Sequence, residues 1–247
     1  MLFVALVPVA LATPALGDPA APSPDQVVSI AVGPAGVWLG STTGARCFVP
    51  RDAGALIRSE LDIELARLIK DAHPTRIDVS AAPGASYAAL TLALGRAFAT
   101  GVGAVGVVTE APRLAPPARV PTTCLDPVAA VALPDAAMPM RSRATTRAAA
   151  ITWRAAVQAP ADALATLAID TTSLTVSSDG HATPAGTVAA LAASERTYAP
   201  LLAALRAAPD ARILIITAAP ATDATLIARV VEIARRAGFD HIVFATA

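Results

Sequence analysis

The chain has 247 residues, and 55% of them are hydrophobic, which suffices to bury one large core or two small ones and argues against wholesale disorder. It carries 19 basic and 19 acidic residues. A nucleic-acid-binding protein usually shows a basic excess, so we expect no nucleic-acid partner.

Residues 1–17 have the features of a secretory signal. The apolar stretch over residues 2–12 is shorter than the ~20 residues of a membrane span, but it fits the apolar region of a signal peptide. Ala15 and Gly17 have the spacing that signal peptidase requires, which predicts cleavage before Asp18. No basic residue precedes the apolar stretch, so an uncleaved anchor and a plain buried segment stay open as alternatives.

A first module is predicted over residues 27–110, after a linker at residues 18–26. Its apolar periodicity and turn residues predict strands at 28–32 and 37–39, a helix from about 52 to 72, a strand at 77–80, a helix that ends at Gly101, and a strand at 105–108. The order is therefore strand, strand, helix, strand, helix, strand.

Asp78 interrupts the aliphatic run of the strand at 77–80. A carboxylate in a central strand costs free energy unless it is paired, and Arg76 or Arg96 could supply the partner. The alternative is that this strand has one face in water, and we expect the latter.

Residues 111–161 are rich in proline and are interpreted as a mostly extended linker. Within it, Ile151-Thr152-Trp153 is the segment that could add a strand. The linker also carries four arginines: Arg141, Arg143, Arg147 and Arg154. We interpret them as part of a solvated tether, and the sharper alternative is a docking patch for an anionic component of the cell envelope.

A second module is predicted over residues 162–247. One constant offset along the chain places Pro83 on Pro220 and Gly101 on Gly238, with one or two insertions needed further upstream. We call it the repeat offset. Short strands are expected at 167–169 and 174–176, a helix after Thr197, a strand at 213–216, a helix that Thr222 caps and Gly238 ends, and a strand at 242–244.

These patterns predict an α+β fold with two tandem two-layer modules, each a mixed sheet covered on one face by two helices. The last three elements of each module form a β–α–β unit, whose two strands should be parallel. The uncovered face or edge of such a sheet commonly mediates dimerisation or strand addition.

The sequence offers little local evidence of chemistry. Cys47 and Cys124 could pair in an oxidising compartment, and the alternative is two unrelated buried thiols. Residues 101–106 read GVGAVG, but a helix precedes them and a strand follows, which is the reverse of a dinucleotide-binding turn. We assign no catalytic, cofactor-binding or metal-binding residue, and expect a protein that is not an enzyme.

The stretch from Ala211 to Ala247 resembles the C-terminal half of the periplasmic domain of ExbD and TolR proteins. The shared marks are the aliphatic strand at 213–216, the polar turn at Thr222-Asp223, the helix end at residues 234–238, and the final Ala245-Thr246. The first copy resembles the family less closely, through Gly101 and the strand that ends in Thr109-Glu110.

The resemblance implies an exported, periplasmic component of a biopolymer transport or envelope energy-transduction system, acting as a non-catalytic docking module. The implied partners are ExbB/TolQ-like inner-membrane proteins, other envelope proteins or peptidoglycan, and the two modules could pair within one chain or between chains. The family's functional aspartate lies in a membrane helix, whereas residues 1–17 hold no ionisable side chain. Two alternatives therefore stay open: a proton-driven motor subunit whose helix was lost to a wrong start, anchored in the inner membrane, and a small hydrolase or transferase with a dispersed site.

Overall fold

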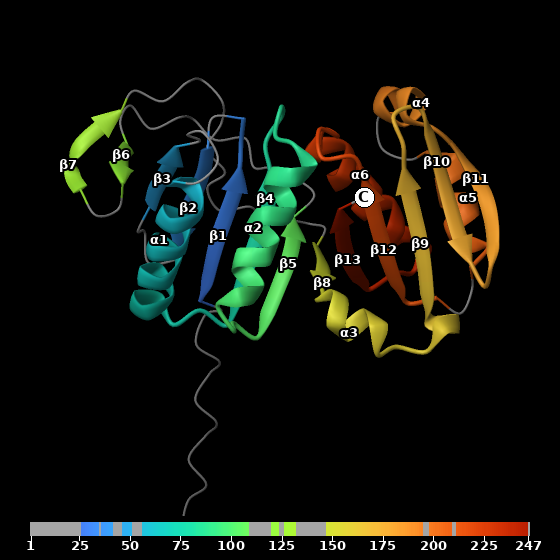
Figure 1. Ribbon diagram of the computed structural model, residues 1–247, viewed down its shortest axis with the longest axis horizontal. Helices are drawn as coiled ribbons and strands as arrows, with labels where there is room; N and C mark the ends of the chain where they lie inside the picture. The colour runs from blue at the N-terminus through green and yellow to red at the C-terminus, as the bar shows by residue number, and fades with distance from the viewer. Residues whose placement is uncertain are drawn as a thin grey trace, which may run out of the picture.

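The computed structural model describes residues 26–34, 36–41, 46–50, 56–108, 120–123, 126–131, 147–194, 198–208 and 211–246 (Figure 1). The predicted signal at residues 1–17 lies outside the described residues, as does nearly all of the linker at 18–26. Among the described helices, none is both long and apolar enough to span a membrane.

The first module contains two helices and strands that pair in the order β3-β2-β1-β4-β5. Its elements are β1 (Val27–Val32), β2 (Gly36–Ser41), β3 (Arg46–Pro50), α1 (Leu56–Ala72), β4 (Arg76–Ala81), α2 (Tyr87–Ala99) and β5 (Ala104–Val108). The strands β1, β4 and β5 are parallel, as the β–α–β unit predicts.

The second module has the corresponding strand order, β11-β10-β9-β12-β13. Its elements are the 3-10 helix η1 (Ala161–Ala163), β9 (Leu164–Ile169), β10 (Ser173–Ser178), β11 (His181–Thr187), α4 (Val188–Ala193), α5 (Ala199–Arg206), β12 (Ile213–Ala218), α6 (Ala224–Ala237) and β13 (His241–Thr246). The predicted mixed α+β class is confirmed. Each module has one more strand than expected, β3 or β11, because these outer strands lack a clear apolar alternation.

The two copies follow the repeat offset more closely than the sequence suggested. The same offset carries the bounds of β1 onto β9, of β2 onto β10, and of β4 onto β12, with no insertion. The expectation of insertions upstream was therefore wrong. The helices between the third and fourth strands differ in length: α1 covers the positions that correspond to α5 and extends beyond them at both ends. Helix α4 corresponds to residues 51–56, of which 51–55 lie outside the described residues.

The two modules share one 11-stranded sheet, whose strand order is symmetric about β8 (Arg147–Ala150). Strand β8 pairs antiparallel with β5 and parallel with β13, so it joins the inner edges of the two modules. The extra strand expected at Ile151-Thr152-Trp153 is therefore misplaced, since Trp153 begins α3 (Trp153–Val157).

The linker also holds β6 (Val120–Thr123) and β7 (Asp126–Val131), which form a separate two-stranded sheet. The region between the modules thus contains more regular structure than a mostly extended linker.

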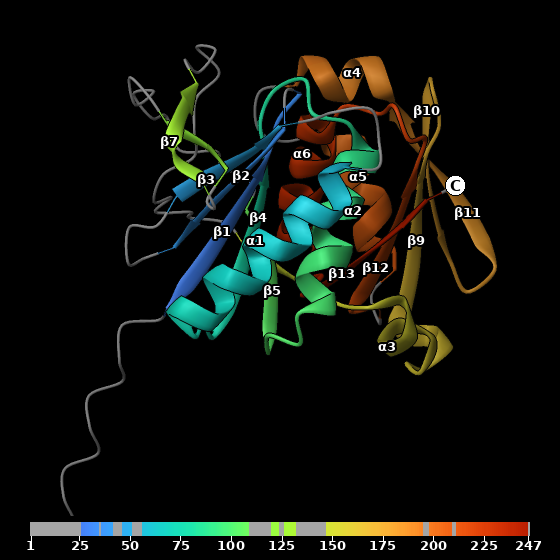
Figure 2. The ribbon, with the colours of Figure 1, turned by 60° about the vertical axis from the view of Figure 1, so that its left-hand side comes forward.

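The helices of the two modules cover one face of the large sheet, and α3 lies on the other face (Figure 2). A single apolar core runs beneath the helices of both modules. Side chains alternate along β12: Leu214 belongs to this core, whereas Ile213 and Ile215 contact Ala156 of α3 together with Val243. The second module is thus buried on both faces where α3 crosses it.

The N-termini of α2 and α6 meet where the two modules join. The Tyr87 N–H donates to the Thr222 carbonyl at 2.7 Å, and the Ala224 N–H donates to the Ala85 carbonyl at 2.8 Å. Between these bonds, Ser86 and Asp223 form an antiparallel bridge. Under the repeat offset Tyr87 corresponds to Ala224 and Ala85 to Thr222, so each hydrogen bond maps onto the other. Ser86 corresponds to Asp223, and these two bonds and the bridge are therefore locally two-fold symmetric.

The side chain of Tyr87 adds an asymmetric contact at the same junction. It is fully buried, and its hydroxyl lies 2.8 Å from the Ile216 carbonyl oxygen and 2.7 Å from that of Ala245, on β12 and β13 of the other module. Burial raises the pKa of the Tyr87 phenol well above its ordinary value. The equivalent residue in the second copy is Ala224, whose side chain is too short for such a contact.

We expect Tyr87→Phe to lower the free energy of unfolding by about 1 kcal/mol, because the Ile216 and Ala245 carbonyls lose the hydroxyl that donates to them and no large cavity is left. Urea unfolding of the variant and of the natural chain measures this. An unchanged midpoint would show that the hydroxyl does not stabilise the junction.

The raised pKa of Tyr87 also predicts a loss of stability in alkali. Since the phenol stays neutral in the folded chain, its contribution is complete below the unfolded pKa of about 10 and falls as the pH rises further. Urea unfolding between pH 8 and pH 11 should show this decline in the natural chain and less of it in Tyr87→Phe. Equal declines in both proteins would contradict the assignment.

Candidate functional site

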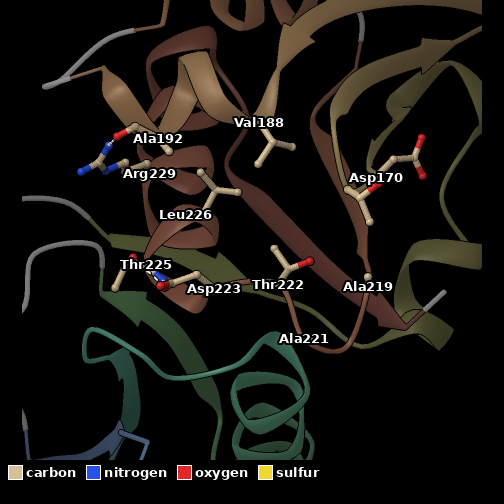
Figure 3. A pocket seen from close by; sticks show the side chains of 11 residues that line it. Asp170, Val188, Ala192, Ala219, Ala221, Thr222, Asp223, Thr225, Leu226 and Arg229 are labelled. Atoms are coloured by element: carbon tan, nitrogen blue, oxygen red, sulfur yellow. Dashed lines mark hydrogen bonds between the residues drawn. The ribbon is translucent and has the colours of Figure 1, made fainter.

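A pocket of about 390 Å³ lies in the second module, at the carboxyl ends of β9 and β12 (Figure 3). In parallel α/β sheets, ligands commonly bind outside this end of the strands. The pocket is lined by Asp170, Thr171, Val188, Ala192, Ala219, Ala221, Thr222, Asp223, Thr225, Leu226 and Arg229.

The interior of the pocket is apolar. Figure 3 shows Val188 of α4 and Leu226 of α6 in its middle, above Thr222, and the alanines of the β12–α6 turn complete the wall. Leu226 is 6% exposed and belongs to the core of the molecule, so its position is fixed by packing. The pocket therefore offers a rigid apolar surface to a side chain of modest size.

Asp223 forms the N-cap of α6, a role that the sequence pattern had assigned to Thr222. Its Oδ1 accepts hydrogen bonds from the Thr225 N–H and the Thr225 hydroxyl, both at 2.7 Å. The partial positive charge of the helix N-terminus is thus already met by a carboxylate of the protein. The expected end of this helix is confirmed, since Gly238 is its C-cap with a left-handed φ of 109°.

Arg229 supports one wall of the pocket from outside. Its Nη1 lies 2.6 Å from the Ala192 carbonyl oxygen, 2.9 Å from that of Ser194 and 3.3 Å from that of Leu191, at the end of α4. The last carbonyls of a helix have no partner within the helix, so the guanidinium caps α4 and holds it against α6. In Figure 3 the guanidinium lies at the outer end of the pocket, away from Thr222.

Asp170 marks the opposite end, directly after β9. The Ser173 hydroxyl donates to its Oδ2 at 3.4 Å, and its backbone N–H donates to the Ser173 carbonyl at 3.0 Å, which closes the β9–β10 turn. The residue is exposed, and Figure 3 shows its carboxylate at the rim rather than inside. The rim therefore presents negative charge to solvent beside an apolar interior.

The first copy has a different set of residues at the equivalent positions. Under the repeat offset, Asp170, Thr171, Thr222, Asp223, Thr225, Leu226 and Arg229 correspond to Gly33, Pro34, Ala85, Ser86, Ala88, Ala89 and Leu92. Moreover, a Cβ at Gly84 would lie 3.6 Å from Pro34, so the two turns of the first copy pack together. The apolar interior with an acidic rim belongs to the second copy.

The residues that the sequence singled out lie away from this pocket. Cys47 lies in β3, and its predicted partner Cys124 is outside the described residues, so the disulfide stays a prediction. Of the four arginines of the proposed basic patch, Arg141 and Arg143 are outside the described residues, Arg147 begins β8, and Arg154 is exposed on α3. Among the described residues, no group of three or more His, Cys, Asp or Glu could hold a metal ion.

The expectation of a wet face at Asp78 was wrong. Asp78 is 5% exposed, and the Arg76 Nε lies 3.0 Å from its Oδ1, whereas Arg96 pairs with Asp62 at 3.1 Å. Strand β4 lies between β1 and β5, and Ser80 on the same face is also buried. The carboxylate is therefore paired within the sheet, as a buried charge must be.

Comparisons with protein-family models and with curated proteins find no match to this chain.

The buried pair of Arg76 and Asp78 can be tested by substitution. The second copy suggests the replacement, because Ile213 and Ile215 occupy the equivalent positions there. Arg76→Met should lower the free energy of unfolding by about 2 kcal/mol, since it removes a partner of a buried carboxylate. Asp78→Ile should cost less than about 1 kcal/mol, because an apolar residue replaces the buried charge. Urea unfolding of both variants measures the difference, and a larger cost for Asp78→Ile would contradict this interpretation.

Proposed function

We propose that the protein is an exported, ExbD/TolR-like component of an envelope transport or energy-transduction system and acts as a non-catalytic docking module. One observation carries the proposal. The stretch from Ala211 to Ala247, which resembles the family, forms β12, α6 and β13, and its residues 219–229 also make most of the pocket. The first copy, which resembles the family less closely, has small or apolar residues at the equivalent positions.

The pocket is a better docking site than the edge of the sheet formed by β11, the outer strand of the same module. The edge strand β11 carries Pro184, which has no N–H to donate. It also carries a register shift next to Gly186, whose φ is 106°. A Cβ at Gly186 would lie 2.0 Å from the Tyr198 hydroxyl, and that hydroxyl accepts the Thr187 N–H at 3.2 Å. A proline and a bulge are devices that prevent strand addition.

The proposal is tested with the full chain, carrying a C-terminal tag, in its own host. We expect it in the periplasmic fraction, and we expect an ExbB/TolQ-like inner-membrane protein to be recovered with it after gentle cross-linking. Sedimentation with isolated peptidoglycan tests the other implied partner. A chain that stays in the cytoplasm, or that recovers neither partner, would overturn the proposal.

A further inference from the structure

The duplication supplies an internal comparison for the pocket. Both copies form the same strand–helix–strand frame at the repeat offset, so a side chain that only the second copy has is not needed to build that frame. Leu226 replaces Ala89 and Asp170 replaces Gly33. Asp223 replaces Ser86, although serine caps α2 equally well by accepting the Ala89 N–H. The interior and the rim of the pocket thus carry side chains that the frame shared by the two copies does not require.

The carboxylates of Asp170 and Asp223 at the rim can each accept a further hydrogen bond. Of their hydrogen bonds within the described part of the chain, Asp223 uses Oδ1 for Thr225 and Asp170 uses Oδ2 for the Ser173 hydroxyl. One oxygen of each is left to accept from a ligand. Both residues are exposed, so a cation can reach them without desolvating the interior.

Where a ligand would enter the pocket, the charged groups that the described residues leave available are carboxylates. Among the described lining residues Arg229 is the one cation, and its guanidinium is engaged with the carbonyls at the end of α4. The positive end of α6 is capped by Asp223 itself. The groups that the described lining residues offer a ligand are therefore an apolar interior, the Thr171 and Thr222 hydroxyls, and two carboxylates at the rim.

We propose that this pocket docks an aliphatic side chain of a partner protein, adjacent to a lysine or arginine that meets Asp170 or Asp223. The aliphatic group fills the space between Val188 and Leu226, for which about 390 Å³ is ample. The basic residue stays at the rim, where the carboxylates lie. This inference deepens the proposed function and rests on it in taking the pocket as the docking site.

Blocked tetrapeptides test the proposal directly on the full chain. The probes are Ala-Leu-Lys-Ala, its charge-reversed twin Ala-Leu-Glu-Ala, and Ala-Ala-Lys-Ala, which lacks the anchor. In NMR titrations at low salt, Ala-Leu-Lys-Ala should shift the amides of Ala219, Thr222 and Leu226, but not those of their first-copy equivalents. We expect it to bind about 5-fold more tightly than the glutamate twin, as for a pair of exposed opposite charges. The peptide without leucine should bind still more weakly.

The variant Asp170→Asn combined with Asp223→Asn should remove the preference for lysine over glutamate, while asparagine keeps the cap of α6. The matched control is Asp179→Asn, an exposed aspartate in the β10–β11 turn of the same module, and it should leave the preference unchanged. Equal binding of the lysine and glutamate peptides to the natural chain would overturn the proposal, as would absence of shifts at the pocket. Either result can occur while envelope partners are still recovered, so the two proposals fail separately.

Discussion

The rest of the structure depends on the reciprocal contact between the N-termini of α2 and α6. Two reciprocal backbone hydrogen bonds, from Tyr87 to Thr222 and from Ala224 to Ala85, and a third from Ala88 to Pro220 join the modules. Their donors are N–H groups that every residue except proline possesses. Because the contact is two-fold symmetric, it allows two copies of one module to meet without new side chains. The Tyr87 hydroxyl adds a contact from the first copy to the carbonyls of Ile216 and Ala245 in the sheet of the second. Strand β8 lies between β5 and β13 and pairs with both.

The same turns serve different purposes in the two copies. In the first copy, Pro34 packs over the turn at Gly84, and Tyr87 reaches across the junction. In the second copy, a small residue, Ala224, replaces the tyrosine, and α4 forms one wall of the pocket. Arg229 makes this arrangement possible by capping α4. The first copy thus supplies the side chain that crosses the junction, and the second copy forms the pocket.

Much of the fold could be predicted because its signals are local. The aliphatic run of β12 and the glycine after α6 mark their elements without help from distant residues. Strand β8 reads Arg-Ala-Ala-Ala and has no strand signal of its own, and it is a strand because β5 and β13 offer it two edges. The pocket was missed because parallel pairing of β9 with β12 brings Asp170 to Thr222 from distant positions in the chain. Comparison of the two copies position by position was the signal that could have found it.

Because the two modules share one sheet and one apolar core, we expect them to unfold as one cooperative unit. Trp38 lies in β2 of the first module and Trp153 begins α3, which covers the second. The variants Trp153→Phe and Trp38→Phe each leave one reporter for urea unfolding followed by fluorescence. We expect the same midpoint and the same slope for both reporters, with a slope that fits the surface of the whole described chain. Two separate midpoints, each with the shallower slope of a single module, would contradict it.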